Sequence, residues 1–233
     1  MSPEIRIFIL LIINLLCYYL FGFHIAAFSF LITIYGVLSI YKITITPHLF
    51  QNNFRAGICY IKDYTGGYTS HSDVWAYMCK LKEEKNLNDF SLIALYYDQP
   101  QKDKEKEKQQ RCSIGFYLKN DSDENIQVPE EIEKCLIVEE KFRKHNLVGA
   151  KSIYCCWDYF NSFTMMLGIK KFYSLIQKKI NSKKFMNAYN IKKEQINVGI
   201  EVYENFFGEQ NIHFYFPFQN NDKFFLYGKE KNE

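Results

Sequence analysis

The sequence predicts an α+β protein in which an apolar helical segment precedes a globular part made of two β-α-β-β units. Two observations carry this prediction. Residues 7–41 contain no Asp, Glu, Lys or Arg, whereas the rest of the 233-residue chain has the charge content of an ordinary globular protein. In that remainder, strand-like and helical patterns occur twice in the order strand, helix, strand, strand. We therefore expect a membrane anchor over residues 1–44 and a soluble domain over residues 45–233.

The uncharged segment predicts an anchor that the mature protein retains. A single helix over its 35 residues would be roughly 52 Å long, against about 30 Å for the hydrocarbon core of a bilayer. A break near residues 22–24 would give a short helical hairpin. One tilted span over residues 25–41, preceded by an interfacial helix, is the alternative. The near absence of basic residues before the segment, and its length, argue against a cleaved signal peptide.

The basic residues around the anchor predict its orientation. Lys42, Arg55 and Lys62 follow the segment, and only Arg6 precedes it. Because positive residues favour the cytoplasmic side, the C-terminal domain is expected in the cytosol, or in the matrix if the membrane is mitochondrial.

The first β-α-β-β unit follows the anchor. Its segments are a strand at 55–63, a helix at 71–82, and strands at 91–97 and 112–118. A turn with Gly66 and Gly67 ends the first strand, and a mixed-charge loop at 101–111 separates the last two.

The second unit repeats this order after an acidic linker. Its segments are a strand at 151–157, a helix from Asn161 or Ser162 to about 180, and strands at 197–203 and 211–218. Residues 136–138, between the units, can be read as helix or strand, and we interpret them as a strand.

Composition and motifs argue against several function classes. The seven Cys include no CxxC pair and are interpreted as reduced, buried thiols, and the five His form no HExxH pair. No metal site or cofactor is therefore expected. GxSxG, P-loop and GxGxxG motifs are absent as well, so the chain is predicted not to be an enzyme.

Four short motifs occur in an order that resembles one family. They are Leu95-Tyr96-Tyr97-Asp98-x-Pro100, Arg111-Cys112-x-Ile114-Gly115, Glu201-Val202-Tyr203, and Ile212-His213-Phe214 followed by Pro217. Their order and spacing resemble the testis-expressed endoplasmic-reticulum membrane proteins with a gyrase-inhibitory-protein-like (GyrI-like) domain, a family that includes a reticulophagy receptor. The resemblance covers residues 55–227. It implies two β-α-β-β units related by a pseudo-twofold axis, with a ligand cleft between them.

The chain departs from that family at both ends. Its apolar segment is longer than one anchor requires, and only 15 residues follow Phe218, so it lacks the tail through which the receptor binds autophagy modifiers. Two segments match the letters of the modifier-binding motif, Phe90-Ser-Leu-Ile93 and Tyr173-Ser-Leu-Ile176. The first begins a predicted core strand and the second lies in a packed helix stripe. We therefore do not carry the autophagy role over.

Glu201 is the candidate site residue. It lies between Ile200 and Val202 in a predicted strand, so its side chain is expected on the opposite sheet face from theirs and on the same face as Tyr203. An exposed sheet face is one reading of this pattern, and a carboxylate in a cleft is the other.

The resemblance places strands 55–62 and 151–157 near the pseudo-twofold axis. Tyr60, Trp157 and Tyr203 are then candidates to line the cleft. A desolvated Glu201 there would favour a lipophilic cation, because a buried carboxylate is costly unless it meets an opposite charge. The alternative is that the aromatic side chains fill the groove and nothing binds.

Charge is segregated along the globular part. Residues 159–193 contain eight Lys and no acid, whereas residues 121–140 contain eight acids and one Lys. The lysines predict either a solvated helix face or a surface for anionic headgroups or an acidic partner. They lack the aromatic residues and recognition motifs typical of nucleic-acid binding, so no nucleic-acid partner is expected.

Together these observations predict a membrane-anchored, non-enzymatic ligand- or partner-binding protein of the endoplasmic reticulum. Its expected partners are the lipid bilayer, other membrane proteins and a small lipophilic or cationic molecule. The alternative is a structural accessory subunit of a larger membrane complex, in the mitochondrial inner membrane, with a vestigial cleft.

Overall fold

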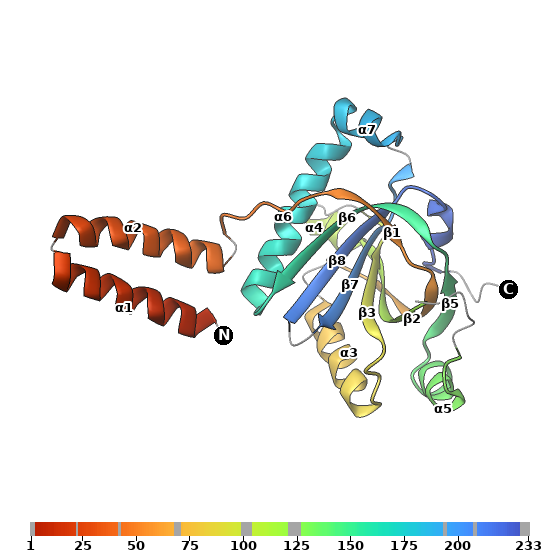
Figure 1. Ribbon diagram of the computed structural model, residues 1–233. Helices are drawn as coiled ribbons and strands as arrows, with labels where there is room; N and C mark the ends of the chain where they lie inside the picture. The colour runs from red at the N-terminus through yellow and green to blue at the C-terminus, as the bar shows by residue number, and fades with distance from the viewer. Residues whose placement is uncertain are drawn as a thin grey trace.

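The chain has an α+β architecture in which a helical hairpin projects from one curled sheet (Figure 1). The computed structural model describes residues 3–21, 23–41, 43–67, 71–98, 104–120, 127–192, 195–206 and 209–228.

The N-terminal hairpin consists of α1 (Pro3–Phe21) and α2 (Phe23–Ile40), which run antiparallel with their connection at the end far from the sheet (Figure 1). The change of direction falls at the predicted break. The helices approach closely, since a Cβ on Gly36 would lie 3.1 Å from Leu10 Cδ1. Asn14 Nδ2 donates a hydrogen bond of 3.4 Å to Thr33 Oγ1 between them.

The hairpin exposes an unusual amount of apolar surface. Large apolar side chains at least 40% exposed on it are Ile5, Phe8, Ile9, Leu11, Ile12, Ile13, Leu15, Leu16, Tyr18, Tyr19, Phe30, Leu31, Ile32, Ile34 and Tyr35. Across the described ranges, no helix combines the length and the apolar character needed to cross a membrane.

One eight-stranded sheet forms the rest of the framework, and every neighbouring pair in it is antiparallel. The strands are β1 (Phe50–Phe54), β2 (Gly57–Thr65), β3 (Ser91–Tyr96), β4 (Arg111–Lys119), β5 (Arg143–Leu147), β6 (Ala150–Tyr159), β7 (Gly199–Phe206) and β8 (Glu209–Pro217). Their spatial order is β1-β6-β8-β7-β3-β4-β2-β5.

The two predicted β-α-β-β units are confirmed as β2-α3-β3-β4 and β6-α6-β7-β8, with α3 at Ser72–Glu84 and α6 at Ser162–Ile180. In each unit the second strand lies at the centre of the sheet, the third beside it and the first outside. The units are thus related by a pseudo-twofold axis between β3 and β7. The expectation that strands 55–62 and 151–157 flank this axis is wrong, because they belong to β2 and β6, the outer strands of the units.

Two short corners force the sheet to curl. Only two residues separate β1 from β2, and two separate β5 from β6, yet each pair lies six strand positions apart. Six gaps in a flat sheet would span about 29 Å, whereas three residue steps reach at most about 11 Å. The ring of Phe54, at the end of β1, accordingly contacts Tyr117 of β4 at 5.5 Å and Tyr215 of β8 at 5.2 Å.

The curl gives the sheet an outer and an inner face. On the outer face α3 and α6 each cover one unit, burying clusters that centre on Phe116 and Phe214. On the inner face the two units share one cluster, which the C-terminal residues Phe224 and Leu226 complete.

Several elements differ from the sequence prediction. The predicted strand at 136–138 is wrong, because these residues form a π-helical turn, Cys135–Glu139, after α5 (Glu130–Lys134). The apolar run is too short to distinguish helix from strand by periodicity, and only Leu136 is fully buried. The sequence also gave no prediction for β1, β5, α7 (Lys183–Tyr189) or α4 (Lys104–Glu107), which lies in the predicted charged loop.

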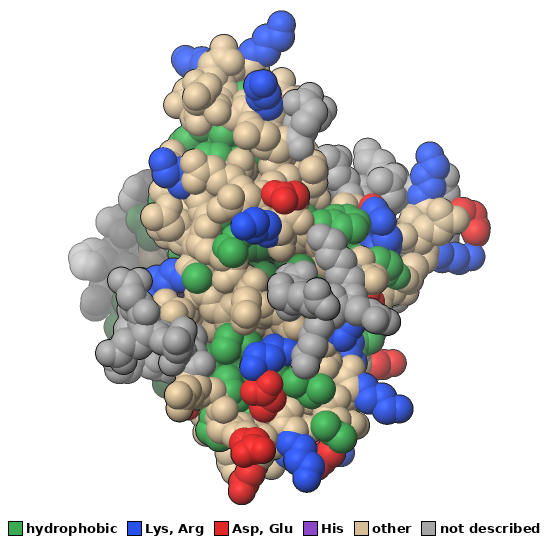
Figure 2. Space-filling view, turned by 90° about the vertical axis from the view of Figure 1, so that its right-hand side faces the viewer, with side chains coloured by type: hydrophobic (Ala, Val, Ile, Leu, Met, Phe, Trp, Pro, Cys, Tyr) green, Lys and Arg blue, Asp and Glu red, His purple; other side chains and the backbone are tan. Residues whose placement is uncertain are grey.

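The basic end of the charge pattern is visible on one face of the molecule. Figure 2 shows mainly basic side chains at the top, the end where α7 lies, and acidic side chains mixed with basic ones in the lower part. Lys183 and Lys184 of α7 are exposed. Lys171 of α6 does not belong to a solvated face. Its Nζ donates hydrogen bonds to the carbonyl oxygens of Ile43, at 2.7 Å, and Ile45, in the linker after the hairpin.

Helix α6 begins as predicted, because Asn161 Oδ1 accepts a hydrogen bond of 2.9 Å from the Thr164 backbone N–H. It lies unusually close to the sheet at Gly168. A Cβ there would be 2.3 Å from Cδ1 of Trp157, whose indole Nε1 donates to the Thr164 carbonyl oxygen at 2.9 Å.

Gly168→Ala is expected to lower the free energy of unfolding by about 1–3 kcal/mol, although alanine favours helix, because the methyl group overpacks the contact with Trp157. Gly149→Ala is the matched control, since the nearest atom to its new methyl group would be 3.6 Å away. Urea denaturation measures both variants. Equal stabilities for the two would contradict the close approach.

Candidate functional site

A buried carboxylate marks the pseudo-twofold axis on the outer face of the sheet. Glu201 of β7 is 1% exposed, and it pairs in register with Ala94 of β3 and Phe214 of β8. It therefore lies at the seam where the clusters under α3 and α6 meet. Its side chain points away from the inner face, as the alternation predicted, but the reading of an exposed sheet face is wrong.

Three tyrosine hydroxyls hold the carboxylate of Glu201. Tyr203 donates to Oε2 at 2.5 Å, Tyr173 of α6 donates to Oε1 at 2.8 Å, and Tyr96 of β3 also contributes a hydrogen bond. The ring of Tyr203 lies 4.6 Å from that of Trp75 in α3. Side chains from both β-α-β-β units thus converge on one carboxylate, and we call Glu201 with these three tyrosines the seam site.

Burial is the largest influence on the pKa of Glu201. It raises the pKa of the carboxyl to about 7, even though the hydrogen bonds from Tyr203, Tyr173 and Tyr96 act in the opposite direction. The group is therefore divided between neutral and ionised forms near neutral pH. Such a carboxyl can accept a cation or exchange a proton with a ligand.

A small, mostly apolar hollow of ≈ 40 Å³ adjoins the seam site. Tyr96 and Tyr173 line it, but Glu201 does not, so the two tyrosines stand between the carboxylate and the hollow. Ile176 and Phe216 line its apolar side. A ligand larger than a few atoms can reach Glu201 from this direction only if Tyr173 moves.

The structure brings together only two of the four residues singled out in the sequence. Tyr203 contacts Glu201, whereas Tyr60 is fully buried in the cluster under α3 and Trp157 lies in the cluster under α6. Tyr96 and Tyr173 were not predicted as partners of Glu201, although Tyr96 belongs to one of the motifs.

The same motifs also carry structural contacts. Asp98 accepts hydrogen bonds from Arg111 Nε and a second guanidinium nitrogen at 2.9 and 2.8 Å, which closes the loop between β3 and β4. Gly115 lets β4 approach β2, because a Cβ there would lie 1.9 Å from the Tyr60 carbonyl oxygen. These contacts explain three of the motif positions, Asp98, Arg111 and Gly115, without any ligand.

Both segments that match the autophagy-motif letters are packed into the fold, as expected. Phe90 and Ile93 are 4% and 0% exposed, and Ile176 is 1% exposed. Tyr173, the aromatic residue of the second match, is half-buried and bonded to Glu201.

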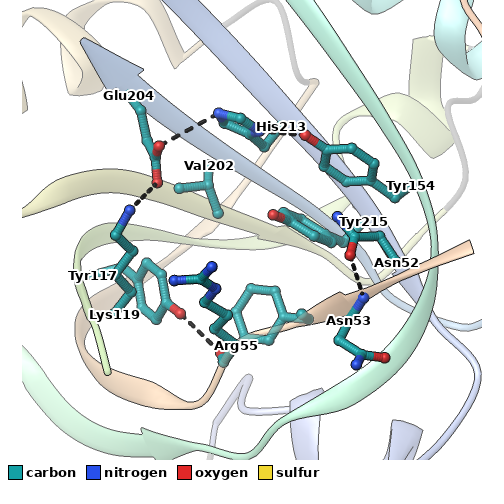
Figure 3. Close-up of a pocket in the computed structure, with 11 residues that line it drawn as sticks. Asn52, Asn53, Arg55, Tyr117, Lys119, Tyr154, Val202, Glu204, His213 and Tyr215 are labelled. Carbon is teal, nitrogen blue, oxygen red and sulfur yellow. Dashed lines mark hydrogen bonds and ion pairs between the residues drawn. The ribbon is translucent and has the colours of Figure 1, made fainter. Parts of the chain in front are cut away.

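A second hollow lies on the inner face and has a volume of ≈ 230 Å³. Its lining residues come from β1, the β1–β2 corner, β4, β6, β7 and β8 (Figure 3). They are Asn52, Asn53, Phe54, Arg55, Tyr117, Lys119, Tyr154, Val202, Glu204, His213 and Tyr215. We call this hollow the inner pocket.

Glu204 is the centre of the polar contacts in the inner pocket. Its carboxylate lies 3.4 Å from His213 Nε2 and 3.8 Å from Lys119 Nζ (Figure 3). His213 Nδ1 shares a hydrogen bond of 2.7 Å with the Tyr154 hydroxyl. No pattern in the sequence predicted this pocket, although His213 belongs to one of the motifs.

Within the described ranges, no group of three or more His, Cys, Asp or Glu side chains could hold a metal ion. The six cysteines of the globular part, Cys59, Cys79, Cys112, Cys135, Cys155 and Cys156, are free thiols, and four of them are buried.

The fold and the seam site together define a duplicated β-α-β-β protein with a buried carboxylate at its axis. No protein-family model and no curated protein matches the chain. Solved structures resemble it at the level of the fold, and all three named here cover most of both chains.

The C-terminal domain of EcmrR matches with a TM-score of 0.42 and 11% identity over 73% of this chain and 96% of its own. The structure of SAV2435 bound to tetraphenylphosphonium matches with a TM-score of 0.41 and 10% identity, over 73% of this chain and 93% of its own. A hydrolase from Listeria innocua matches with a TM-score of 0.37 and 10% identity, over 77% of this chain and 97% of its own. Likenesses this distant assign neither a family nor a ligand to the chain.

Glu201→Gln is expected to remove a pH dependence of stability. The pKa of Glu201 is raised from 4.5 to about 7 on folding, so the native state binds its proton more tightly than the unfolded state. Stability of the wild type therefore falls as pH rises from about 4.5 to about 7, by about 3 kcal/mol in total, and is constant above that range with respect to this group. The stability of Glu201→Gln does not fall over this pH range in the same way, because glutamine carries no charge to desolvate.

Urea denaturation of both proteins between pH 4.5 and 8 measures the difference, in which the other titrating groups cancel. Glu131→Gln, the same substitution at an exposed glutamate of α5 outside the seam site, controls for general effects of substitution. A pH-independent difference between wild type and Glu201→Gln would contradict the raised pKa.

Proposed function

We propose that this chain is a GyrI-like binding protein that takes an organic cation at Glu201 and is held on a membrane by its N-terminal hairpin. The observation that carries the proposal is the seam site, in which both β-α-β-β units direct hydroxyls at one buried carboxylate. The duplicated topology supports the GyrI-like assignment that the sequence motifs suggested.

A cation suits the seam site for electrostatic reasons. Burial makes the ionised form of Glu201 unfavourable, so a positive charge brought beside it would stabilise the carboxylate and displace its proton. The rings of Tyr96, Tyr173 and Phe216 offer π faces to an organic cation. The apolar lining of the adjoining hollow favours a lipophilic body over a hydrated inorganic ion.

The hairpin supports the membrane part of the proposal. Exposed apolar side chains cover both helices, and each such side chain would gain about 1.5–3 kcal/mol on transfer from water to an apolar phase. Both helices meet the sheet region at the same end of the hairpin, so the connecting turn would enter the membrane first (Figure 1). The hairpin would then insert as a wedge, with the globular part remaining at the surface on the side of entry.

The globular part continues this apolar surface. Tyr41, at the end of the hairpin, contacts the rings of Phe160 and Phe163 at 5.7 and 6.1 Å. Phe163 and Met166 of α6 are 54% and 48% exposed. A membrane that accepted the hairpin would therefore also meet the start of α6.

The proposed compartment is the endoplasmic reticulum membrane with the globular part in the cytosol, and the mitochondrial inner membrane is the alternative. The proposed role is non-enzymatic binding. A structural accessory subunit is the second candidate, favoured by the small volume of the hollow beside Glu201. In that case the exposed hairpin would pack against other membrane proteins rather than lipid alone.

Lipophilic cations are expected to raise the melting temperature of the full chain in detergent, and Glu201→Gln is expected to abolish most of the shift. Tetraphenylphosphonium and a quaternary arylammonium serve as probes, and neutral triphenylphosphine oxide is the matched control ligand. The variant removes the negative charge but keeps the size of the side chain. Equal shifts in both proteins, or none with any cation, would favour the structural-subunit candidate.

Membrane retention is expected to depend on the apolar face of the hairpin. After expression in a eukaryotic host, the wild type should stay in the membrane pellet through alkaline carbonate extraction. The double variant Leu11→Lys with Leu31→Lys should be released to a large extent, because each lysine at such a site costs a few kcal/mol. Val138→Lys, at an exposed apolar position outside the hairpin, is the matched control and should be retained.

Asn120 reports the orientation in the same experiment, since Asn120-Asp121-Ser122 is a glycosylation sequon. It is expected to remain unmodified in the cytosol. A glycosidase-sensitive shift that is lost in Asn120→Gln would place the globular part in the lumen and overturn the proposed orientation.

A further inference from the structure

The inner pocket lies across the sheet from the seam site. Val202 and Glu204 of β7 face the pocket, whereas Glu201 and Tyr203 on the same strand face the helices. The two sites share no lining residue. What the inner pocket binds is therefore independent of the function proposed for Glu201.

The residues lining the pocket carry more positive than negative charge. Arg55, Lys119 and His213 contribute the cationic groups, and Glu204 contributes the one carboxylate of the lining. Figure 3 shows Arg55 extending into the pocket between Lys119 and Tyr215. The backbone of Arg55 is held in place, since its carbonyl oxygen accepts a hydrogen bond of 2.8 Å from Tyr117.

The protonation states of His213 and Glu204 near neutral pH bear on this excess of positive charge. Burial lowers the pKa of the His213 imidazole, but hydrogen bonds and charge interactions with Cys156 and Glu204 outweigh it and raise the pKa to about 9. The hydrogen bond from His213 lowers the pKa of Glu204, although burial opposes it. Arg55 and Lys119 outnumber the single carboxylate of Glu204, so the lining stays positive whatever the protonation state of His213.

We propose that the inner pocket binds a small organic anion, a carboxylate or a phosphate monoester attached to a planar ring. The guanidinium of Arg55 provides the planar fork of donors that suits both groups, and Lys119 adds a second charge. The half-buried ring of Tyr215 also lines the pocket and offers an aromatic surface to the planar body.

The volume of the pocket and its neutral polar groups restrict the class of ligand further. A volume of ≈ 230 Å³ is below the range of about 300–1,000 Å³ that is typical for drug-sized ligands, so the anion is a single-ring compound. Asn52 and Asn53 on the β1 side can bond polar substituents of the ring. The positive lining disfavours the organic cations proposed for the seam site.

A cysteine beside the pocket provides a local reporter. Cys156 of β6 is exposed and stands opposite His213 in the register of β6 and β8, so both side chains are on the inner face. Cys79 of α3 is also exposed but lies on the helix that covers the outer face. Alkylation of Cys156 relative to Cys79, measured by mass spectrometry of the peptides, reports occupancy of the pocket alone.

The test is calorimetric titration of the full chain in a nonionic detergent with benzoate, phenyl phosphate, benzamide, benzamidine and inorganic phosphate. Benzoate or phenyl phosphate is expected to bind and to slow alkylation of Cys156 but not of Cys79, and the tighter of the two identifies the acidic group. Benzamide, the neutral isostere, and benzamidine, the cation, are expected not to bind. Inorganic phosphate that binds as tightly as phenyl phosphate would contradict the planar body.

Arg55→Gln is expected to weaken the affinity for the anion by about tenfold or more, and Lys119→Gln, which keeps the corner intact, by a smaller factor. Lys178→Gln, at an exposed lysine of α6, is the matched control and should bind normally. Glu201→Gln should also bind normally, which separates this inference from the seam site. Unchanged affinity in both Arg55→Gln and Lys119→Gln, or equal binding of benzamide and benzoate, would overturn the proposal.

Discussion

Two corners, each two residues long, join strands at opposite ends of the same sheet, and the remaining architecture depends on this constraint. A flat sheet would place β1 and β2 too far apart for residues 55–56 to connect them, so the sheet must curl toward one face. Curling encloses the inner face and brings Arg55, at the first corner, against strands of both units. The inner pocket is therefore a direct consequence of chain connectivity. It does not require a dedicated loop.

The alternation of side chains along β7 then separates two kinds of chemistry by the thickness of one sheet. Glu201 faces the helix-covered side, where burial raises its pKa, whereas Glu204 faces the pocket, where His213 lowers its pKa. The same residue type is thus partly neutral on one face and ionised on the other. Ionisation of Glu201 opposes folding, because the hydrogen bonds from three tyrosines offset the cost of burial only in part.

Local patterns in the sequence were sufficient for the repeated units but not for their arrangement. The long strands and the Asn161-capped helix have clear periodicity, and the alternation around Glu201 correctly predicted its face. Strand order carries no local signal, so β2 and β6 were expected at the pseudo-twofold axis, which lies between β3 and β7. Tyr60 and Trp157 were for that reason included with Tyr203. The edge strands β1 (FQNNF) and β5 (RKHNL) have too few apolar residues to be recognised.

Helix α6 contacts both the linker of the hairpin and the seam site, through residues that are two positions apart in the sequence. Lys171 holds the carbonyl oxygens of Ile43 and Ile45 in the hairpin's linker, and Tyr173 donates to Glu201. Gly168 lets the same helix lie directly on Trp157, so α6 has little freedom to shift without disturbing that contact. The tyrosine that bonds Glu201 and the lysine that holds the hairpin's linker thus belong to one helix that is packed tightly on the sheet.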